Sequence, residues 1–157
     1  MKRFPASRRL FSEYNPARYV RTEQLQEFSE RLGAKEFEPV DPSSIPFPIK
    51  GIIVGSSTHR LFINLAVTYR ALDTTEPKTI WVPFLVSSGS PWNFMSSRTM
   101  SALGVIPARE TTFRVHGFDD VFMNLSPPGS HFTDINVLGG DFFHHTYVTL
   151  CTSYHKR

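Results

Sequence analysis

From residue 51 onward, the chain consists of short apolar segments separated by turn-forming residues. The segments are rich in Ile, Val, Phe, Leu and Tyr, which favour strands, and they cover residues 51–55, 59–72, 78–86, 111–118, 120–126, 134–138 and 146–154. One face of the second segment is aliphatic and is expected to lie in a core: Leu61, Ile63, Leu65 and Val67. Residues 96–104 and 140–145 interrupt this pattern and are expected to form brief helices. Many short strands with two short helices predict an all-β fold, a small closed or partly closed barrel.

The first 47 residues have a different character. Residues 22–33, TEQLQEFSERLG, carry Leu25, Phe28 and Leu32 along one helical face, so they predict a short helix that packs on its own domain or on a partner. Four prolines at positions 39, 42, 46 and 48 then exclude a helix or a central strand. We therefore expect an N-terminal extension over residues 1–47, with a proline-rich linker, and a compact domain over residues 48–157.

The net charge of +3 is unevenly distributed along the chain. Residues 1–21 carry six basic residues against Glu13, whereas the rest of the chain carries 11 basic and 13 acidic residues. A basic arm can contact nucleic acid or an anionic membrane, and an Arg-rich, Ser-containing start also fits an organellar transit peptide. A solvated leader is the simplest interpretation. Nucleic-acid binding is expected only through residues 1–21.

Chain length and cysteine content limit the classes of protein that remain. A chain of 157 residues, 40% of them hydrophobic, can bury one core of ordinary size. No apolar run approaches the roughly 20 residues of a transmembrane helix, and the single Cys151 cannot form an internal disulfide. An intracellular, most simply cytoplasmic, setting is expected, with Cys151 as a small buried hydrophobe in a strand. Neighbouring His144 and His145 point in different directions and have no supporting Cys or carboxylate cluster, so no metal and no cofactor is predicted.

Two segments resemble each other in layout. Residues 84–104, FLVSSGSPWNFMSSRTMSALG, and residues 135–150, INVLGGDFFHHTYVTL, each run from an apolar strand through a turn of small residues into a helix. In this order, the two segments resemble the first and second signatures of the retropepsin-like aspartic proteases of retroviruses and retrotransposons. The resemblance covers roughly residues 50–154. It implies an acid-protease barrel that forms a homodimer, with Leu138 and Gly139 in the second signature.

The first signature departs from the family at the residue that does the chemistry. Family members carry Asp at the position of Ser87, Thr or Ser at Ser88, and Gly at Gly89. The resemblance implies a site of two aspartates, one from each chain, that share one proton, so the single replacement removes both. None of Asp73, Asp119, Asp120, Asp134 and Asp141 lies in the turn. A Ser/His/Asp hydrolase has less support than an inactive protease, because the GxSxG motif is absent and no histidine is singled out as a partner for a serine by its spacing.

Three hypotheses follow from these observations. The first is a catalytically inactive retropepsin-like module that dimerises and binds an extended peptide or a protein. Here Gly117 is the tip of the flap hairpin, and residues 146–154 supply a strand to an intersubunit sheet. The second is an aspartic endopeptidase whose acid was replaced by Ser87, through natural loss or engineering. The third places the function in the basic arm, with the barrel as a dimerisation platform.

Overall fold

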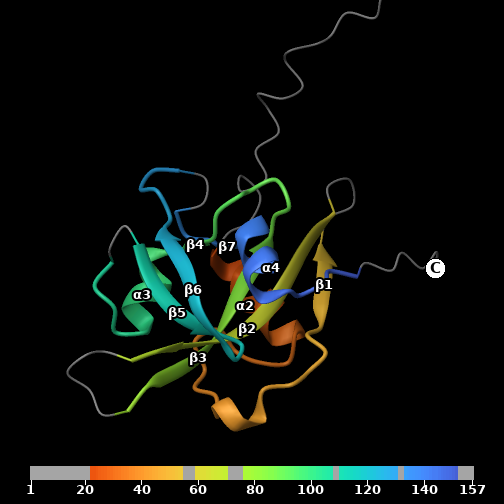
Figure 1. The fold of residues 1–157 in the computed structure, drawn as a ribbon. Coiled ribbons are helices and arrows are strands. Elements are labelled where there is room, and N and C mark those ends of the chain that lie inside the picture. The colour runs from red at the N-terminus through yellow and green to blue at the C-terminus, as the bar shows by residue number, and fades with distance from the viewer. Residues whose placement is uncertain (1–21, 55–58, 71–75, 108–109, 131–132, 152–157) are drawn as a thin grey trace, which may run out of the picture.

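The computed structural model describes residues 22–54, 59–70, 76–107, 110–130 and 133–151. Within these ranges, strands predominate and the helices are short (Figure 1). The elements in chain order are α2 (Thr22–Arg31), η2 (Pro42–Ser44), β1 (Gly51–Val54), β2 (Arg60–Tyr69), β3 (Lys78–Val86), β4 (Phe94–Met95), α3 (Ser97–Ala102), β5 (Glu110–Val115), β6 (Phe118–Leu125), β7 (Asn136–Leu138) and α4 (Gly140–Thr146).

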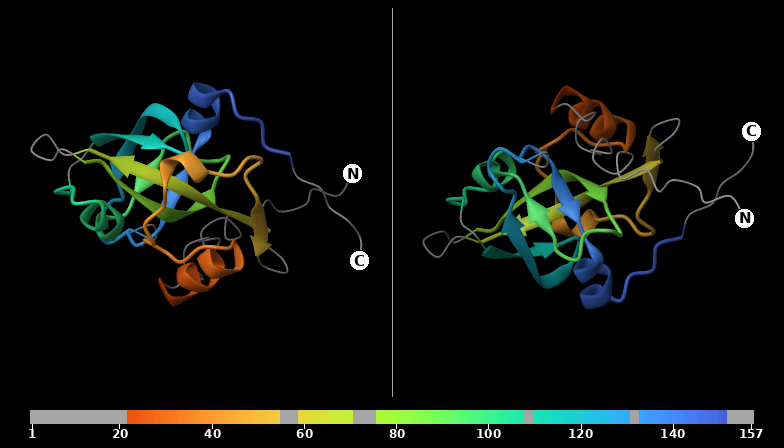
Figure 2. Two further views of the ribbon diagram at one scale, coloured as in Figure 1. Left: turned by 90° about the horizontal axis from the view of Figure 1, so that it is seen from below. Right: turned by 90° about the horizontal axis from the view of Figure 1, so that it is seen from above.

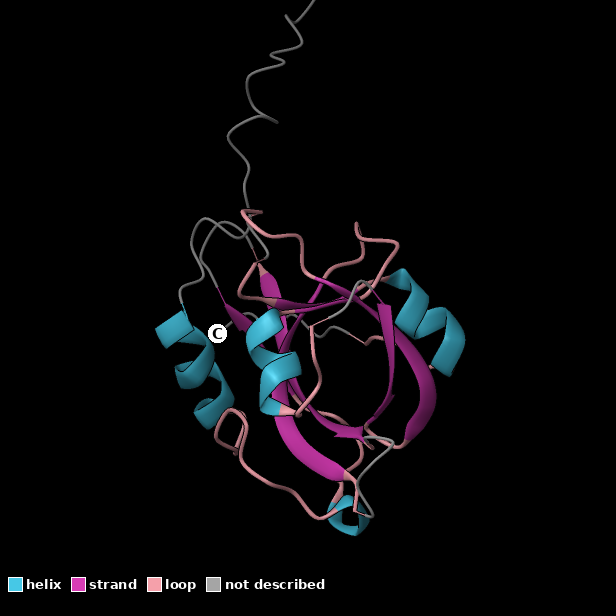
Figure 3. Ribbon diagram, turned by 90° about the vertical axis from the view of Figure 1, so that its left-hand side faces the viewer, coloured by secondary structure: helices cyan, strands magenta, loops and turns pink. Residues whose placement is uncertain are grey.

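Six of the strands close into a barrel. The order of the sheet is β1-β2-β3-β7-β4-β6-β5, and a further pairing between β2 and β5 closes the ring. Figure 3 shows the strands curving around the centre of the molecule, with helices outside them. The long strand β2 makes this closure possible, because its first half pairs with β1 and its second half pairs with β5 at Val67 and Thr68. The predicted all-β barrel with short helices is confirmed at this level.

The interior of the barrel is formed by one face of each strand. On β2 the predicted core face is confirmed, because Ile63, Leu65 and Val67 are buried in the same cluster. Their neighbours across the interior come from most other elements: Val82, Phe84, Met95, Met100, Phe113, Val115, Val121, Met123, Leu138 and Phe142. Burying a side chain of this size contributes about 1.5–3 kcal/mol, so this cluster is the main source of the fold's stability.

The opposite face of β2 is also buried, which the sequence did not indicate. Helix α2 lies on it, and Leu25 and Phe28 pack with Phe62 in a second cluster. Figure 2 shows α2 on one side of the barrel and α4 on the other. A buried hydrogen-bonded pair accompanies this contact, since the Asn64 amide donates to the Ser29 hydroxyl over 2.8 Å and to the Ser29 carbonyl over 3.1 Å. Helix α2 is therefore part of the folded unit.

The chain before residue 48 is in direct contact with the barrel. After α2, the chain runs beside the free edge of β3, where the Phe37 amide donates to the Trp81 carbonyl and the Trp81 amide donates to the Glu38 carbonyl. Arg98 at the start of α3 also holds Glu36 at 3.0 Å. Prolines do not prevent this contact, because an edge segment needs only alternate amides for pairing. Residues 22–47 belong to the same folded unit as the barrel, and residues 1–21 lie outside the described residues.

The predicted strand over residues 146–154 is not found in its described part. Helix α4 continues to Thr146 and ends at Tyr147, which is left-handed with a φ of 56°. Residues 148–151 then pair with no strand of the described chain, and Cys151 is exposed rather than buried. A strand needs a neighbouring edge for its backbone hydrogen bonds, and residues 148–151 are paired with no strand edge among the described residues. Residues 152–154 lie outside the described residues.

Candidate functional site

The fold brings the two signatures into direct contact. Strand β3, which leads into Ser87, runs parallel to β7, with Leu85 opposite Val137 and Val86 opposite Leu138. The ladder continues one residue further, because the Ser87 amide donates to the Leu138 carbonyl over 2.9 Å. Ser87 and Leu138 are therefore neighbours, although 50 residues separate them in the chain.

A backbone hydrogen bond closes the turn that follows β3, and the tip of this turn is exposed to solvent. The Ser90 amide donates to the Ser87 carbonyl over 3.1 Å, and the Ser90 hydroxyl donates to the Trp92 carbonyl over 2.7 Å. Ser88 and Gly89 are exposed, and a Cβ added at Gly89 would meet nothing within 4 Å. The turn thus tolerates a side chain at Gly89 in the isolated chain.

Gly139, in contrast, is enclosed by the turn. A Cβ at this position would lie 2.6 Å from the Ser90 carbonyl oxygen and closer still to that of Trp92. Both are backbone atoms, which cannot move away as a flexible side chain would. The next amides reinforce the contact, since that of Gly140 donates to the Ser90 carbonyl over 2.8 Å and that of Asp141 to the Pro91 carbonyl over 3.0 Å. The two predicted signature glycines, Gly89 and Gly139, therefore differ, because only at Gly139 does the surrounding backbone leave no room for a side chain.

Two buried asparagines hold this junction together, and the sequence did not single them out. The Asn93 amide donates to the Phe122 carbonyl over 3.1 Å, while its oxygen accepts from the Gly139 amide over 3.0 Å. Asn136 accepts from the Ser96 amide over 2.9 Å and donates to the Pro83 carbonyl over 3.1 Å. Asn136 is a polar residue inside an apolar strand, whereas Asn93 lies just before β4 in a stretch with no periodic pattern. Such buried amides fix one arrangement of the strands, because each group left unpaired costs about 1–3 kcal/mol.

The chemistry of the turn is limited by what surrounds it. Among the described residues, the acid that hydrogen bonds place beside the turn is Asp141, and its carboxylate accepts from the Asn93 amide over 3.3 Å. The hydroxyls of Ser87 and Ser88 form no hydrogen bond within the described part of the chain. A serine hydroxyl cannot act as a general base near neutral pH, and without a neighbouring base it is not activated as a nucleophile either. The same described residues contain no group of three or more His, Cys, Asp or Glu side chains that could hold a metal.

Gly117 is the tip of a hairpin, as predicted, but not of a flap over the turn. The hairpin of β5 and β6 meets β2 at Val67, whereas the end of β3 that leads into Ser87 meets β2 at Leu61. Six residues of strand separate these positions, which is about 20 Å. In Figure 1 the connection between β5 and β6 lies in the lower part of the barrel, and the chain that follows β3 runs along the top. The hairpin therefore does not cover Ser87.

His116, next to Gly117, is buried and hydrogen-bonded to the backbone of two other segments. Its ring is almost fully buried, Nδ1 accepts from the Ala66 amide over 3.4 Å, and Nε2 lies 3.0 Å from the Pro46 carbonyl. These contacts require a proton on Nε2 and none on Nδ1, which is the neutral ring. Burial lowers the pKa of His116, although the hydrogen bond to Pro46 opposes this shift. The ring fastens the proline-rich segment to the barrel and has no serine partner in the described structure.

Comparisons of the chain with protein-family models, curated proteins and solved structures found no match. A function for this chain is therefore inferred from its own residues and geometry.

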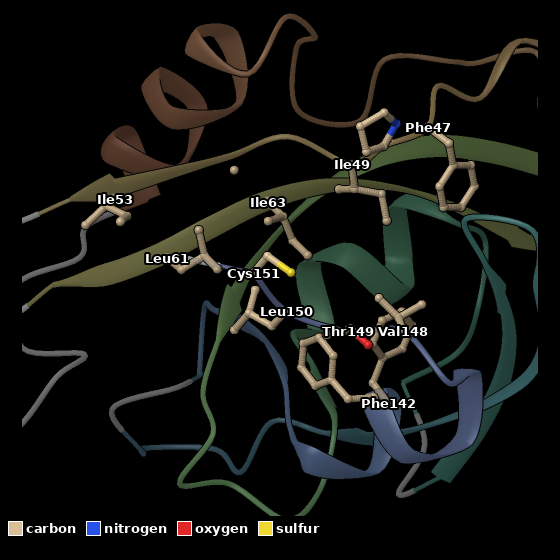
Figure 4. A pocket seen from close by; sticks show the side chains of 13 residues that line it. Phe47, Ile49, Ile53, Leu61, Ile63, Phe142, Val148, Thr149, Leu150 and Cys151 are labelled. Carbon is tan, nitrogen blue, oxygen red and sulfur yellow. The ribbon is translucent and has the colours of Figure 1, made fainter. Parts of the chain in front are cut away.

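A groove of about 530 Å³ lies between the start of the barrel and the C-terminal segment (Figure 4). Leu150 and Cys151 from that segment face Leu61 and Ile63 of β2. The remaining lining is mainly apolar: Phe47, Pro48, Ile49, Gly51, Ile53, Phe142, Phe143, Val148 and Thr149. Strand β1 borders the groove, and its outer edge pairs with no strand in the part of the chain that the structure describes. An extended backbone segment fits such an edge.

No helix within the described residues is both long enough and apolar enough to cross a bilayer.

Proposed function

We propose that this chain is a retropepsin-like domain without catalytic activity, which forms a homodimer and binds an extended peptide or a protein. The observation that carries the proposal is the contact between the two signatures, in which the Ser87 turn lies against Leu138 and Gly139. Backbone contact of this kind supports the resemblance, since each signature by itself is only a common turn.

The absence of an acid in the turn supports the loss of activity. Peptide hydrolysis in the family that this chain resembles needs two adjacent carboxylates that share a proton, one to activate water and one to polarise the carbonyl. Ser87 occupies the position of that carboxylate, and Asp141 is already engaged by Asn93. In a homodimer, both halves of the site carry the same serine.

The C-terminal segment supports dimerisation. Residues 148–151 have no strand partner of their own, β1 has one unpaired edge, and an apolar groove separates them. Tyr147 and Leu150 are 93% and 47% exposed, which is unfavourable for apolar groups in water. A second copy of the segment in the groove would cover these side chains and complete a sheet through main-chain hydrogen bonds.

The test of inactivity uses unstructured peptides at acidic to neutral pH. We expect no cleavage by the purified chain, because no group in the turn titrates in this range. Cleavage that pepstatin inhibits would contradict the proposal. The matched control is the variant Ser87→Ala purified in the same way, because a contaminating protease would cleave the peptides equally in both samples.

The alternative function is an aspartic endopeptidase in which only the acid has been replaced. The intact support around the turn favours it, since Asn93, Asn136 and Gly139 still fix the backbone on both sides. The substitution Ser87→Asp distinguishes the two functions. Gained proteolysis supports the alternative, whereas continued inactivity of a folded, dimeric variant supports the binding module.

A further inference from the structure

A pocket of about 270 Å³ lies where the end of α2, the proline-rich segment and the barrel meet. This volume is just below the roughly 300 Å³ at which pockets for drug-sized molecules begin, so the pocket suits a smaller ligand. Pro48 and Ile49 line both this pocket and the groove beside the C-terminal segment, so the two spaces share one wall. The proposed function does not use this pocket.

The lining of the pocket is largely apolar. Trp81 of β3 contributes the largest side chain and is only partly buried. Leu32, just after α2, and Pro46 of the proline-rich segment also line the pocket. A flat apolar group that packs against an indole and aliphatic side chains is favourably removed from water. The pocket therefore suits a ligand with a small ring.

The uncharged polar groups of the lining already have partners. Both polar atoms of the Asn64 side chain lie at hydrogen-bond distance from Ser29. Both ring nitrogens of His116 are engaged by backbone groups, one with Ala66 and one with Pro46. These contacts keep the His116 ring neutral. Neither Asn64 nor His116 therefore brings a charge to the pocket.

Among the described residues that line the pocket, Lys50 alone carries a charge at neutral pH. It is also the single charged residue in the apolar run IPFPIKGIIV, residues 45–54. Lys50 forms no ion pair within the described ranges. The backbone of Glu38 pairs with Trp81, but the Glu38 carboxylate accepts a hydrogen bond from the Lys35 amide. The pocket thus has one positive charge without a counter-charge among these residues, which favours an anion.

We propose that this pocket binds a small aromatic monocarboxylate, with its ring against Trp81 and its carboxylate beside the Lys50 ammonium group. A charged hydrogen bond of this kind is stronger than a neutral one. A phosphate group would bring a second negative charge, which no other residue of the described lining balances. The inference goes beyond the proposed function and does not rest on it, because the pocket is formed within a single chain.

The test uses the full chain and two probes of equal shape, phenylacetate and its uncharged amide, phenylacetamide. Titration followed by backbone amide NMR reports both the affinity and the place of binding. We expect the largest shifts at residues 32–34, 46–50 and 81. Phenylacetate should bind roughly fivefold or more tightly than phenylacetamide, because only the acid forms a charged pair with Lys50.

Two variants test the two parts of the pocket. Lys50→Gln should remove the preference for the acid, while Lys78→Gln, at an exposed position outside the pocket, should retain it. Ala34→Leu adds bulk to the lining and should weaken binding of both probes. Chemical denaturation of each variant shows whether the chain is folded, so a loss of binding through unfolding is recognised.

Three results would overturn the inference. The first is no binding of phenylacetate at millimolar concentrations, and the second is an equal preference for the acid in the wild type and in Lys50→Gln. The third is a set of shifts confined to Leu61 and Leu150, which would assign the probe to the groove. None of these results depends on the mass of the assembly or on proteolysis, so they are separable from a failure of the proposed function.

Discussion

Gly139 and Gly117 are both glycines at chain reversals, and they are needed for opposite reasons. Gly139 has an ordinary extended backbone, with a φ of −94°, but no space for a Cβ. Gly117 has open space around it, but a φ of +90°, which side chains rarely adopt. The first requirement comes from a contact between distant segments and the second from local geometry. Contact between distant segments is what assembles a site, so Gly139 marks the candidate site and Gly117 does not.

The largest effect is expected for Gly139→Ala. The added methyl group meets two backbone carbonyl oxygens, so the strand and the turn must separate, and we expect a loss of about 3 kcal/mol or more in the free energy of unfolding. Chemical denaturation followed by circular dichroism measures it.

The matched control for this substitution is Gly89→Ala in the same turn, which has open space. Its free energy of unfolding should change by less than about 0.5 kcal/mol. A loss for Gly139→Ala that is as small as the loss for Gly89→Ala would show that the turn and residues 135–150 are not in contact.

A smaller effect is expected for Gly117→Ala. The methyl group itself is accommodated, and the loss of about 1 kcal/mol comes from holding a side chain at positive φ. Asn tolerates this conformation better, so Gly117→Asn should recover part of the loss. An equal loss for Ala and Asn would point to crowding at the tip instead of backbone strain.

The pH dependence of stability tests whether His116, next to Gly117, is buried as a neutral ring. Burial lowers the pKa of His116, so the unfolded chain takes up a proton at a higher pH than the folded chain does. The folded chain is therefore most stable, as far as His116 is concerned, above the pKa of about 6.5 that this ring has in the unfolded chain. Its stability decreases as the pH falls below that value. We expect His116→Gln to flatten this decrease between neutral and mildly acidic pH.

The comparison for His116→Gln is the wild-type slope of stability against pH, with His144→Gln as the control on an exposed site. The control should leave the slope unchanged. Identical slopes for the wild type and His116→Gln would mean that this ring is not buried in its neutral form.

The sequence was informative where a residue's neighbours are local. Alternation along β2 predicted the core face, and Gly117 predicted a hairpin tip, because both depend on a few adjacent residues. The existence of most strands followed in the same way, although periodicity gave no indication of β4, because that strand has only two residues. The barrel class could therefore be predicted before its strand order.

The rest depends on contacts that a single sequence does not encode in a readable pattern. The stripe of Leu25 and Phe28 predicted that α2 packs on a surface, but not that the surface is the cluster containing Leu85. Asn93 and Asn136 gained their importance only when segments about 40 residues apart met. The predicted C-terminal strand is not found because α4 takes up the chain as far as Thr146, and residues 148–151 do not pair with the edge of β1 or with any other described strand.

Sedimentation equilibrium is the most direct test of the proposal that the chain forms a dimer around a site without an acid. We predict a mass about twice the 17.9 kDa of one chain, shifting to one chain's mass when Leu150→Asp places a charge in the groove. A wild-type mass of one chain at tens of micromolar, with the protein folded, would contradict the account.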